Sequence, residues 1–163
     1  MSVHIDKLAH HPYWLHQVVE WLHGEWLRYS DELDSSEMHI AERLSERKAA
    51  MKQHLGQQPV PTTFLAYEGE HLMGAVSLVR YASSIEPDRV WLTNLYVDVP
   101  FQGEGLGTRL LYYAEEFAAT IGLAELSLYT FEAKDFYAQR GWNWLTKGEL
   151  HGRAVDVFSK SVH

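Results

Sequence analysis

A glycine-rich run, Gln102-Gly103-Glu104-Gly105-Leu106-Gly107, stands where an extended apolar segment, Trp91 to Val97, gives way to an amphipathic helical pattern. Glycines in a turn from strand to helix let the backbone approach a ligand closely. The first turn of the following helix offers unpaired N–H groups and the positive end of the helix dipole to an anion. The run therefore predicts a cradle for a phosphate-bearing ligand.

The composition indicates one globular unit. The chain has 163 residues, of which 46% are hydrophobic and 13% aromatic, so we expect a single domain over residues 1–163 with one proper core. An apolar run long enough to span a membrane is missing, as is the apolar stretch of a signal peptide, and we expect a cytoplasmic protein with no membrane partner. Cysteine is absent, which excludes disulfides, thiolate metal sites and cysteine nucleophiles.

The charge pattern bears on partners. The formal net charge is −8, and acidic residues are concentrated between Glu20 and Glu46. Such a field repels nucleic acid and favours an amine-bearing partner, although a solvated helical face has the same composition. The ten histidines form no HExxH motif and no closely spaced set with carboxylates, so we expect no metal site.

The hydrophobic periods predict an α/β fold of the α+β type, with a mixed sheet of six to seven strands and about four helices. A strand, glycine turn, helix and strand in succession make Trp91–Thr130 a βαβ unit with one parallel pair. The expected strands are residues 4–8, Thr62–Glu68, Leu72–Tyr81, Arg89–Val97, Leu126–Thr130, Trp142–Lys147 and Ala154–Lys160. The expected helices are residues 12–29, a second helix capped by Ser35 or Ser36 and closed by Gly56, then Gly105–Ile121 and Ala133–Arg140.

Two common phosphate cradles do not fit the glycine run. A Walker loop ends in Gly-Lys-Ser/Thr, whereas Gly107 is followed by Thr108 and Arg109, so the phosphate-binding lysine is missing. A dinucleotide-binding loop has the spacing GxGxxG and an acidic residue that binds ribose. Here the spacing is GxGxG, and neither Glu125 nor Glu132 matches that acid well.

Three motifs in order carry a resemblance to a known family. Gln102, Gly105 and Gly107 match the signature Q/R-x-x-G-x-G/A, and the chain resembles the GNAT acyltransferase superfamily. Leu95-Tyr96-Val97-Asp98 resembles the family's strand end L-x-V-D, and Phe136-Tyr137-Ala138-Gln139-Arg140-Gly141-Trp142 resembles its F-Y-x-x-x-G-F/W element. The order of elements agrees over essentially the full length. The resemblance implies a single-domain GNAT fold with acetyl-CoA as the acyl donor.

The resemblance also implies the donor site. The pantetheine arm of acetyl-CoA would pair with the strand end at residues 95–97, and backbone N–H groups of residues 102–108 would hold the pyrophosphate. Side chains would collide at Gly105 and Gly107. Many members carry Asn seven residues before the tyrosine, to fix the pantetheine arm, and this chain has Thr130 there. The predicted cofactor-binding residues are Leu95, Tyr96, Val97, Gln102, Gly103, Glu104, Gly105, Leu106, Gly107, Thr108 and Thr130.

The implied chemistry is direct attack of an amine on the thioester. Tyr137 is the predicted acid for the departing thiolate, with a purely packing role beside Phe136 as the structural alternative. The resemblance places the oxyanion donor at the Val97 N–H. Some members carry a Glu earlier on this same strand, but residues 91–94 here are Trp, Leu, Thr and Asn. A proton would therefore leave through water to a group elsewhere, for which the candidates are Glu132, Glu37 and His151.

Two functions of different class follow from these residues. One is an N-acetyltransferase that moves the acetyl group of acetyl-CoA to a primary amine of a small molecule or a peptide. The other is a catalytically silent module that binds acyl-CoA. The motifs identify neither the acceptor nor the acyl group beyond the family's usual acetyl, since fold-level analogy carries no substrate information. A homodimer is compatible with the apolar closing strands.

Overall fold

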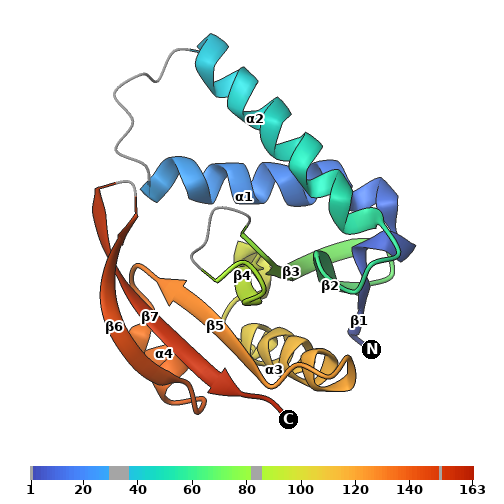
Figure 1. Ribbon diagram of the computed structural model, residues 1–163. Coiled ribbons are helices and arrows are strands. Elements are labelled where there is room, and N and C mark those ends of the chain that lie inside the picture. The colour runs from blue at the N-terminus through green and yellow to red at the C-terminus, as the bar shows by residue number, and fades with distance from the viewer. Residues whose placement is uncertain (1, 30–36, 82–85, 151) are drawn as a thin grey trace.

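The computed structural model describes residues 2–29, 37–81, 86–150 and 152–163 and contains a seven-stranded mixed sheet with helices on both faces (Figure 1). The strands are β1 (His4–Lys7), β2 (Thr62–Glu68), β3 (His71–Val79), β4 (Trp91–Val97), β5 (Glu125–Thr130), β6 (Asn143–Leu150) and β7 (Arg153–Ser161). The helices are α1 (Leu15–Tyr29), α2 (Glu37–Met51), α3 (Leu106–Thr120) and α4 (Lys134–Ala138). The predicted fold class is confirmed.

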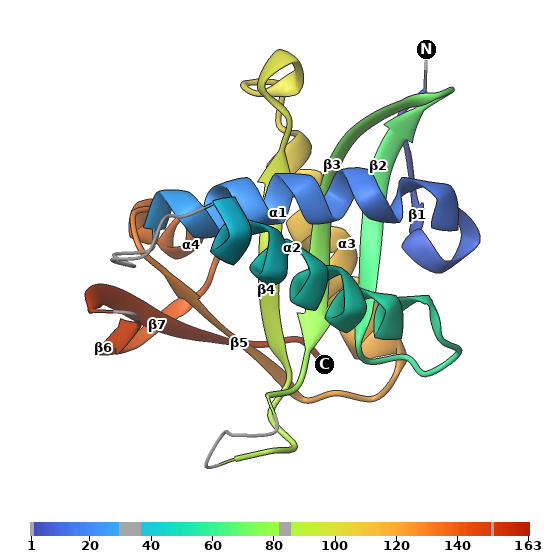
Figure 2. The same cartoon turned by 90° about the horizontal axis from the view of Figure 1, so that it is seen from above.

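The strand order β1-β2-β3-β4-β5-β7-β6 includes one parallel pair, β4 with β5, and every other pair is antiparallel. This is the βαβ unit that the sequence predicts, with α3 as its crossover. Helices α1 and α2 cross one face of β2, β3 and β4, while α3 lies on the opposite face (Figure 2). The described residues contain no helix that is long and apolar enough to cross a membrane.

Alternating side chains of the central strands supply two cores, one on each face of the sheet. Phe64 and Val76 point into the larger core, which α3 closes. Their neighbours Leu65 and Ala75 point into the core below α1. The sheet is therefore buried on both faces here, which fixes the positions of α1 and α3 relative to β4.

The first two predicted helices include 3₁₀ turns at their ends, and the last two, predicted as Gly105–Ile121 and Ala133–Arg140, are one or two residues shorter at each end. The first begins with a 3₁₀ turn, Pro12–Trp14, before α1, and the second continues beyond α2 as a 3₁₀ turn, Lys52–Leu55, which stops before Gly56. Tightening of terminal turns is common in helices, because i to i+3 bonds satisfy end groups. The predicted caps Ser35 and Ser36 lie outside the described residues.

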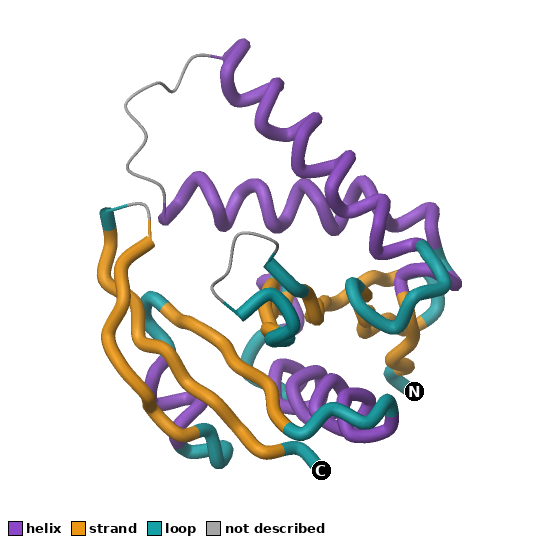
Figure 3. The backbone as a smooth tube through the Cα atoms, viewed as in Figure 1, coloured by secondary structure: helices purple, strands orange, loops and turns teal. Residues whose placement is uncertain are grey.

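The parallel pair is short, and this shapes the molecule. Strand β4 pairs with β5 at a single register position, Trp91 with Ser127, whereas β5 pairs with β7 along its whole length. The β5-β7-β6 half of the sheet turns away from the β1–β4 half (Figure 3). As a result β4 and β5 separate beyond Trp91 towards their carboxyl ends.

Candidate active site

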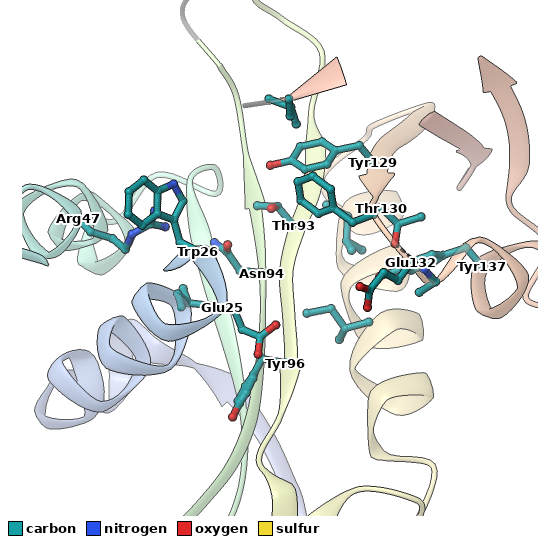
Figure 4. Close-up of a pocket in the computed structure, with 16 residues that line it drawn as sticks. Glu25, Trp26, Arg47, Thr93, Asn94, Tyr96, Tyr129, Thr130, Glu132 and Tyr137 are labelled. Atoms are coloured by element: carbon teal, nitrogen blue, oxygen red, sulfur yellow. Dashed lines mark hydrogen bonds between the residues drawn. The ribbon is translucent and has the colours of Figure 1, made fainter. Parts of the chain in front are cut away.

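A cavity of about 490 Å³ occupies the wedge between β4 and β5. Its walls come from α1 and α2 on one side, β4 in the middle, and β5 with the segment after it on the other (Figure 4). A cavity of this size matches sites for small ligands. Because it lies at the carboxyl ends of two parallel strands, its position follows directly from their separation.

A β-bulge in β4 shapes the cavity floor. The register with β3 shifts between Tyr96 and Thr93, so that Asn94 and Leu95 together oppose the single residue Val76. Asn94 has φ of 58°, a left-handed conformation that asparagine tolerates better than most side chains. Bulges re-aim side chains and leave a backbone group unpaired, and here both bulge residues line the cavity.

Tyr137 packs in the core and also lines the cavity. Its ring packs edge-on against Phe136 and Trp142, with centroid separations of 5.1 and 6.2 Å, and also contacts Phe158. The residue is only 8% exposed, yet it lines the cavity. Burial raises the pKa of the Tyr137 hydroxyl to about 12, so this group keeps its proton at neutral pH and is available as a donor.

The glycine run adopts the backbone that its composition predicts. Gly103 has φ of 83°, and Gly105, the residue before α3, has φ of 81°, conformations that favour glycine. A Cβ at either position would meet no protein atom within 4 Å, and at Gly107 it would make only ordinary contacts with Val97 and Phe136. The protein itself therefore does not supply the predicted collision at Gly105 and Gly107. The space beside these glycines is open, which fits a pyrophosphate ligand.

Side chains around the run tie it to neighbouring elements. The Gln102 amide donates from Nε2 to the Val97 carbonyl over 2.9 Å. The Arg140 guanidinium donates from Nε to Thr108 Oγ1 over 2.8 Å, and it also donates to the Phe136 carbonyl. These bonds use the side chains of the run for positioning, so an anion at this loop would meet the first-turn N–H groups of α3.

The structure brings four of the predicted residues, Leu95, Tyr96, Thr130 and Tyr137, into the cavity lining. Val97 and residues 102–108 lie outside the lining and follow the end of β4. Thr130 is buried, and its Oγ1 accepts a hydrogen bond from the Ala133 N–H over 3.0 Å. The Thr130 hydroxyl therefore helps to shape the segment that leads into α4 and Tyr137.

Of the three candidates for the general base, only Glu132 has a side chain among the described residues. Glu132 lines the cavity, whereas the Glu37 side chain and His151 lie outside the described residues. The structure adds Glu25 of α1, a second carboxylate in the lining. The pKa of Tyr96 is raised by burial, and the nearby charges of Asp98 and Glu25 raise it further. Glu25 therefore lies near Tyr96, opposite the Glu132 wall (Figure 4).

Trp26, Arg47 and Tyr129 are among the lining residues that sequence reasoning missed. The position of Arg47 could have been predicted from its spacing, because it stands three residues after Leu44 and four before Met51. That spacing places it on the apolar face of α2. Within the described part of the chain, no group of three or more His, Cys, Asp or Glu side chains has the arrangement of a metal site.

The chain combines a parted pair of parallel strands with a glycine loop that leads into the crossover helix. The chain belongs to the acetyltransferase (GNAT) family, whose family model matches residues 15–142. Curated protein sequences show no match to this chain.

Solved structures agree on the fold. The paiA N-acetyltransferase of Thermoplasma acidophilum, in complex with coenzyme A, is 20% identical with a TM-score of 0.70, over 99% of both chains. The yncA protein of Salmonella typhimurium, with its cofactor acetyl-CoA, is 16% identical with a TM-score of 0.67, over 100% of this chain and 94% of that one. N-acetylglutamate synthase of Neisseria gonorrhoeae, complexed with coenzyme A and N-acetyl-glutamate, is 18% identical with a TM-score of 0.66. This chain is covered completely there but spans only 36% of that protein.

Proposed function

We propose that this protein transfers the acetyl group of acetyl-CoA to the nitrogen of a primary amine, with Tyr137 as the acid that protonates the leaving thiolate. The observation that carries the proposal is the position of Tyr137, a buried phenol in the lining of the cavity where β4 and β5 part. Membership of the acetyltransferase (GNAT) family supports acetyl-CoA as the donor.

The donor would lie along the end of β4 and over the glycine run. Its pantetheine arm would pair with the backbone of residues 95–97 and pass Thr130, and its pyrophosphate would accept hydrogen bonds from N–H groups of residues 102–108. The open space beside Gly103 and Gly105 supports this placement. So do the three solved structures above that hold coenzyme A or acetyl-CoA and share the fold.

The reaction would proceed in one addition and one elimination. The uncharged amine nitrogen attacks the thioester carbonyl carbon, and the resulting oxyanion accepts a hydrogen bond, for which the Val97 N–H is the proposed donor. The C–S bond then breaks, the nitrogen loses its proton, and Tyr137 donates its own proton to the thiolate sulfur. The proton from nitrogen returns to the phenolate through water, so the enzyme ends in its starting state.

Two carboxylates support the departure of the amine proton. Glu25 and Glu132 line the cavity near Tyr96 and Tyr137, from opposite walls (Figure 4). Either can attract a protonated amine and take up its proton through water. Asn94, which also lines the cavity, cannot act as a base.

A thiol-release assay over a panel of primary amines tests the proposal. Tyr137→Phe should lower kcat by about 10²- to 10⁴-fold, the usual contribution of a positioned acid. Its affinity for acetyl-CoA, measured by calorimetry, should stay within about threefold, because the ring packing is kept. An unchanged kcat would remove Tyr137 as the acid. Tight binding of acetyl-CoA with no amine-stimulated release would instead favour the silent binding module.

The proposal also covers the setting of the enzyme. The net charge of −8 supports an amine-bearing acceptor over nucleic acid, and we place the protein in the cytoplasm without a bound metal. Trp144 and Leu145 are exposed on β6, the edge strand of the sheet. Exposed apolar side chains on an edge strand support a homodimer through this strand.

A further inference from the structure

The end of the cavity furthest from Tyr137 in Figure 4 carries a positive charge. Arg47 of α2 lines the cavity there, and its guanidinium lies over the ring of Trp26, 5.3 Å from the centroid. Trp26 comes from α1 and lines the cavity as well. A guanidinium stacked on an indole face loses little further freedom when it binds a ligand, because its plane is already oriented.

Arg47 has no acidic partner among the described residues. Burial lowers the pKa of its guanidinium, and the neighbouring charge of Arg43 lowers it further, while Tyr129 and Tyr81 act in the opposite direction. Arginine nevertheless stays charged in proteins. Among the described residues this partly buried cation has the Trp26 ring and the phenols of Tyr129 and Tyr81 as neighbours and no carboxylate, so an anion that reaches it would be stabilised.

Hydroxyl groups next to Arg47 can share in binding that anion. Tyr81 makes hydrogen bonds with the side chains of Tyr129 and Thr93, and the latter two line the cavity. Figure 4 shows the Tyr129 hydroxyl directed towards the side of the cavity that holds Trp26 and Arg47. A fork of guanidinium N–H groups beside hydroxyl donors matches the geometry of a carboxylate.

The charges in the cavity are therefore separated. The carboxylates of Glu25 and Glu132 lie near Tyr96 and Tyr137, where the amine would react, and the guanidinium of Arg47 lies beyond Asn94 and Thr93 (Figure 4). A ligand that carries an amine at one end and an acid at the other complements both regions. A polyamine would place a second positive charge beside Arg47, which is unfavourable.

We propose that the acceptor is a small amino carboxylic acid, whose carboxylate binds Arg47 while its amine faces the acetyl donor. This inference rests on the proposed acetyl transfer and gives its acceptor a chemical class. The volume of about 490 Å³ accommodates a molecule of that size next to the pantetheine end. Arg47 thus acts as a specificity residue that touches the acceptor and takes no part in the proton transfers.

The first experiment measures kcat/KM by thiol release with common amino acids and small ω-amino acids, each paired with its own carboxamide. The wild type should prefer the acids. In Arg47→Gln, kcat/KM for the acids should fall by about 10- to 150-fold, as expected for the loss of a charge-assisted hydrogen bond. For the carboxamides, kcat/KM should stay within about twofold of the wild-type value. Arg47→Lys should recover part of the loss, since it keeps the charge without the fork.

Arg43→Gln is the matched control. Arg43 lies on the same helix and also stacks on Trp26, at 5.4 Å, but it does not line the cavity. Its substitution should change kcat/KM for the acids by no more than about twofold. Equal activity of the wild type on acids and carboxamides would overturn the inference, as would equal losses on both series in Arg47→Gln.

A binding experiment separates this inference from the proposed function. Without turnover of any amine, the acetyl transfer fails as a proposal, and calorimetry then decides the role of Arg47. The same acids and carboxamides are titrated into the wild type and Arg47→Gln in the presence of coenzyme A. Binding of acids alone, lost in Arg47→Gln, supports the carboxylate site. Equal binding of the carboxamides, or no binding of any acid, overturns it.

Discussion

Substituting Gly105 by aspartate places a negative charge in the proposed anion cradle. Gly105 precedes α3 with φ of 81°, and a Cβ there would meet no protein atom within 4 Å. The new carboxylate would stand beside the N–H groups that are proposed to hold the pyrophosphate. Because the protein has room for the side chain, any loss of affinity must come from the backbone conformation or from the ligand.

Two contributions to that loss can be separated. A non-glycine residue in the left-handed region costs roughly 1 to 2 kcal/mol in stability, and asparagine, which has the same shape as aspartate, carries this cost as well. The charge acts only in aspartate. A unit charge about 4 Å from a phosphate charge, at an effective dielectric constant of about 20, is repelled by about 4 kcal/mol. Allowing for exposure to solvent, we expect a loss of about 2 to 4 kcal/mol, or about 30- to 1000-fold in Kd.

Calorimetry with acetyl-CoA on Gly105→Asp and Gly105→Asn measures the difference directly. The difference in Kd for acetyl-CoA between the two variants should become smaller at about 1 M salt, since salt screens exposed charges. Gly69→Asp is the control for strain, because Gly69 has φ of 60° and open space around it in the turn between β2 and β3. Equal affinities for the Asp and Asn variants would refute the placement of the pyrophosphate at this loop.

Two further predictions concern stability. Gly74→Ala puts a Cβ 2.7 Å from the Tyr96 carbonyl oxygen and 3.0 Å from Leu110 Cδ1, and should lower the free energy of unfolding in urea by about 1 to 3 kcal/mol; a change below about 0.5 kcal/mol would contradict this close packing. Burial lowers the pKa of His54, so the unfolded chain takes up its proton first, and stability should fall as pH drops below about 6.5. Thermal unfolding of His54→Gln should show a smaller loss of stability with falling pH than the wild type. A pH profile identical to that of the wild type would exclude His54 as a cause.

Local patterns were sufficient to predict most of the fold. The β-type composition from Thr62 to Glu68 gave β2 with the bounds that the structure has, and its apolar residues are consecutive because one face of this strand lies on the α3 core and the other on the α1 core. The glycine run was readable for a similar reason. Left-handed φ values at Gly103 and Gly105 favour glycine directly, so this backbone conformation can be predicted from the sequence.

The bulge at Asn94 and the acceptor wall could not be predicted in this way. The bulge arises from the register between β3 and β4, and a register shift has no local sequence pattern. Glu25, Arg47 and Tyr129 come from three different elements. They meet only because β4 and β5 separate and because α1 and α2 cover the opening, both of which are properties of the assembled fold.

Arg47 nevertheless shows how a site of this kind can be found from a helix. On α2 it takes an inward position between Leu44 and Met51, where an apolar residue is expected. A charge on that face is costly unless a partner compensates it. The described residues around it supply the ring of Trp26 and the Tyr129 hydroxyl, and none supplies a carboxylate. A carboxylate on the acceptor would compensate the charge of Arg47, which is why we propose an amino carboxylic acid as the substrate.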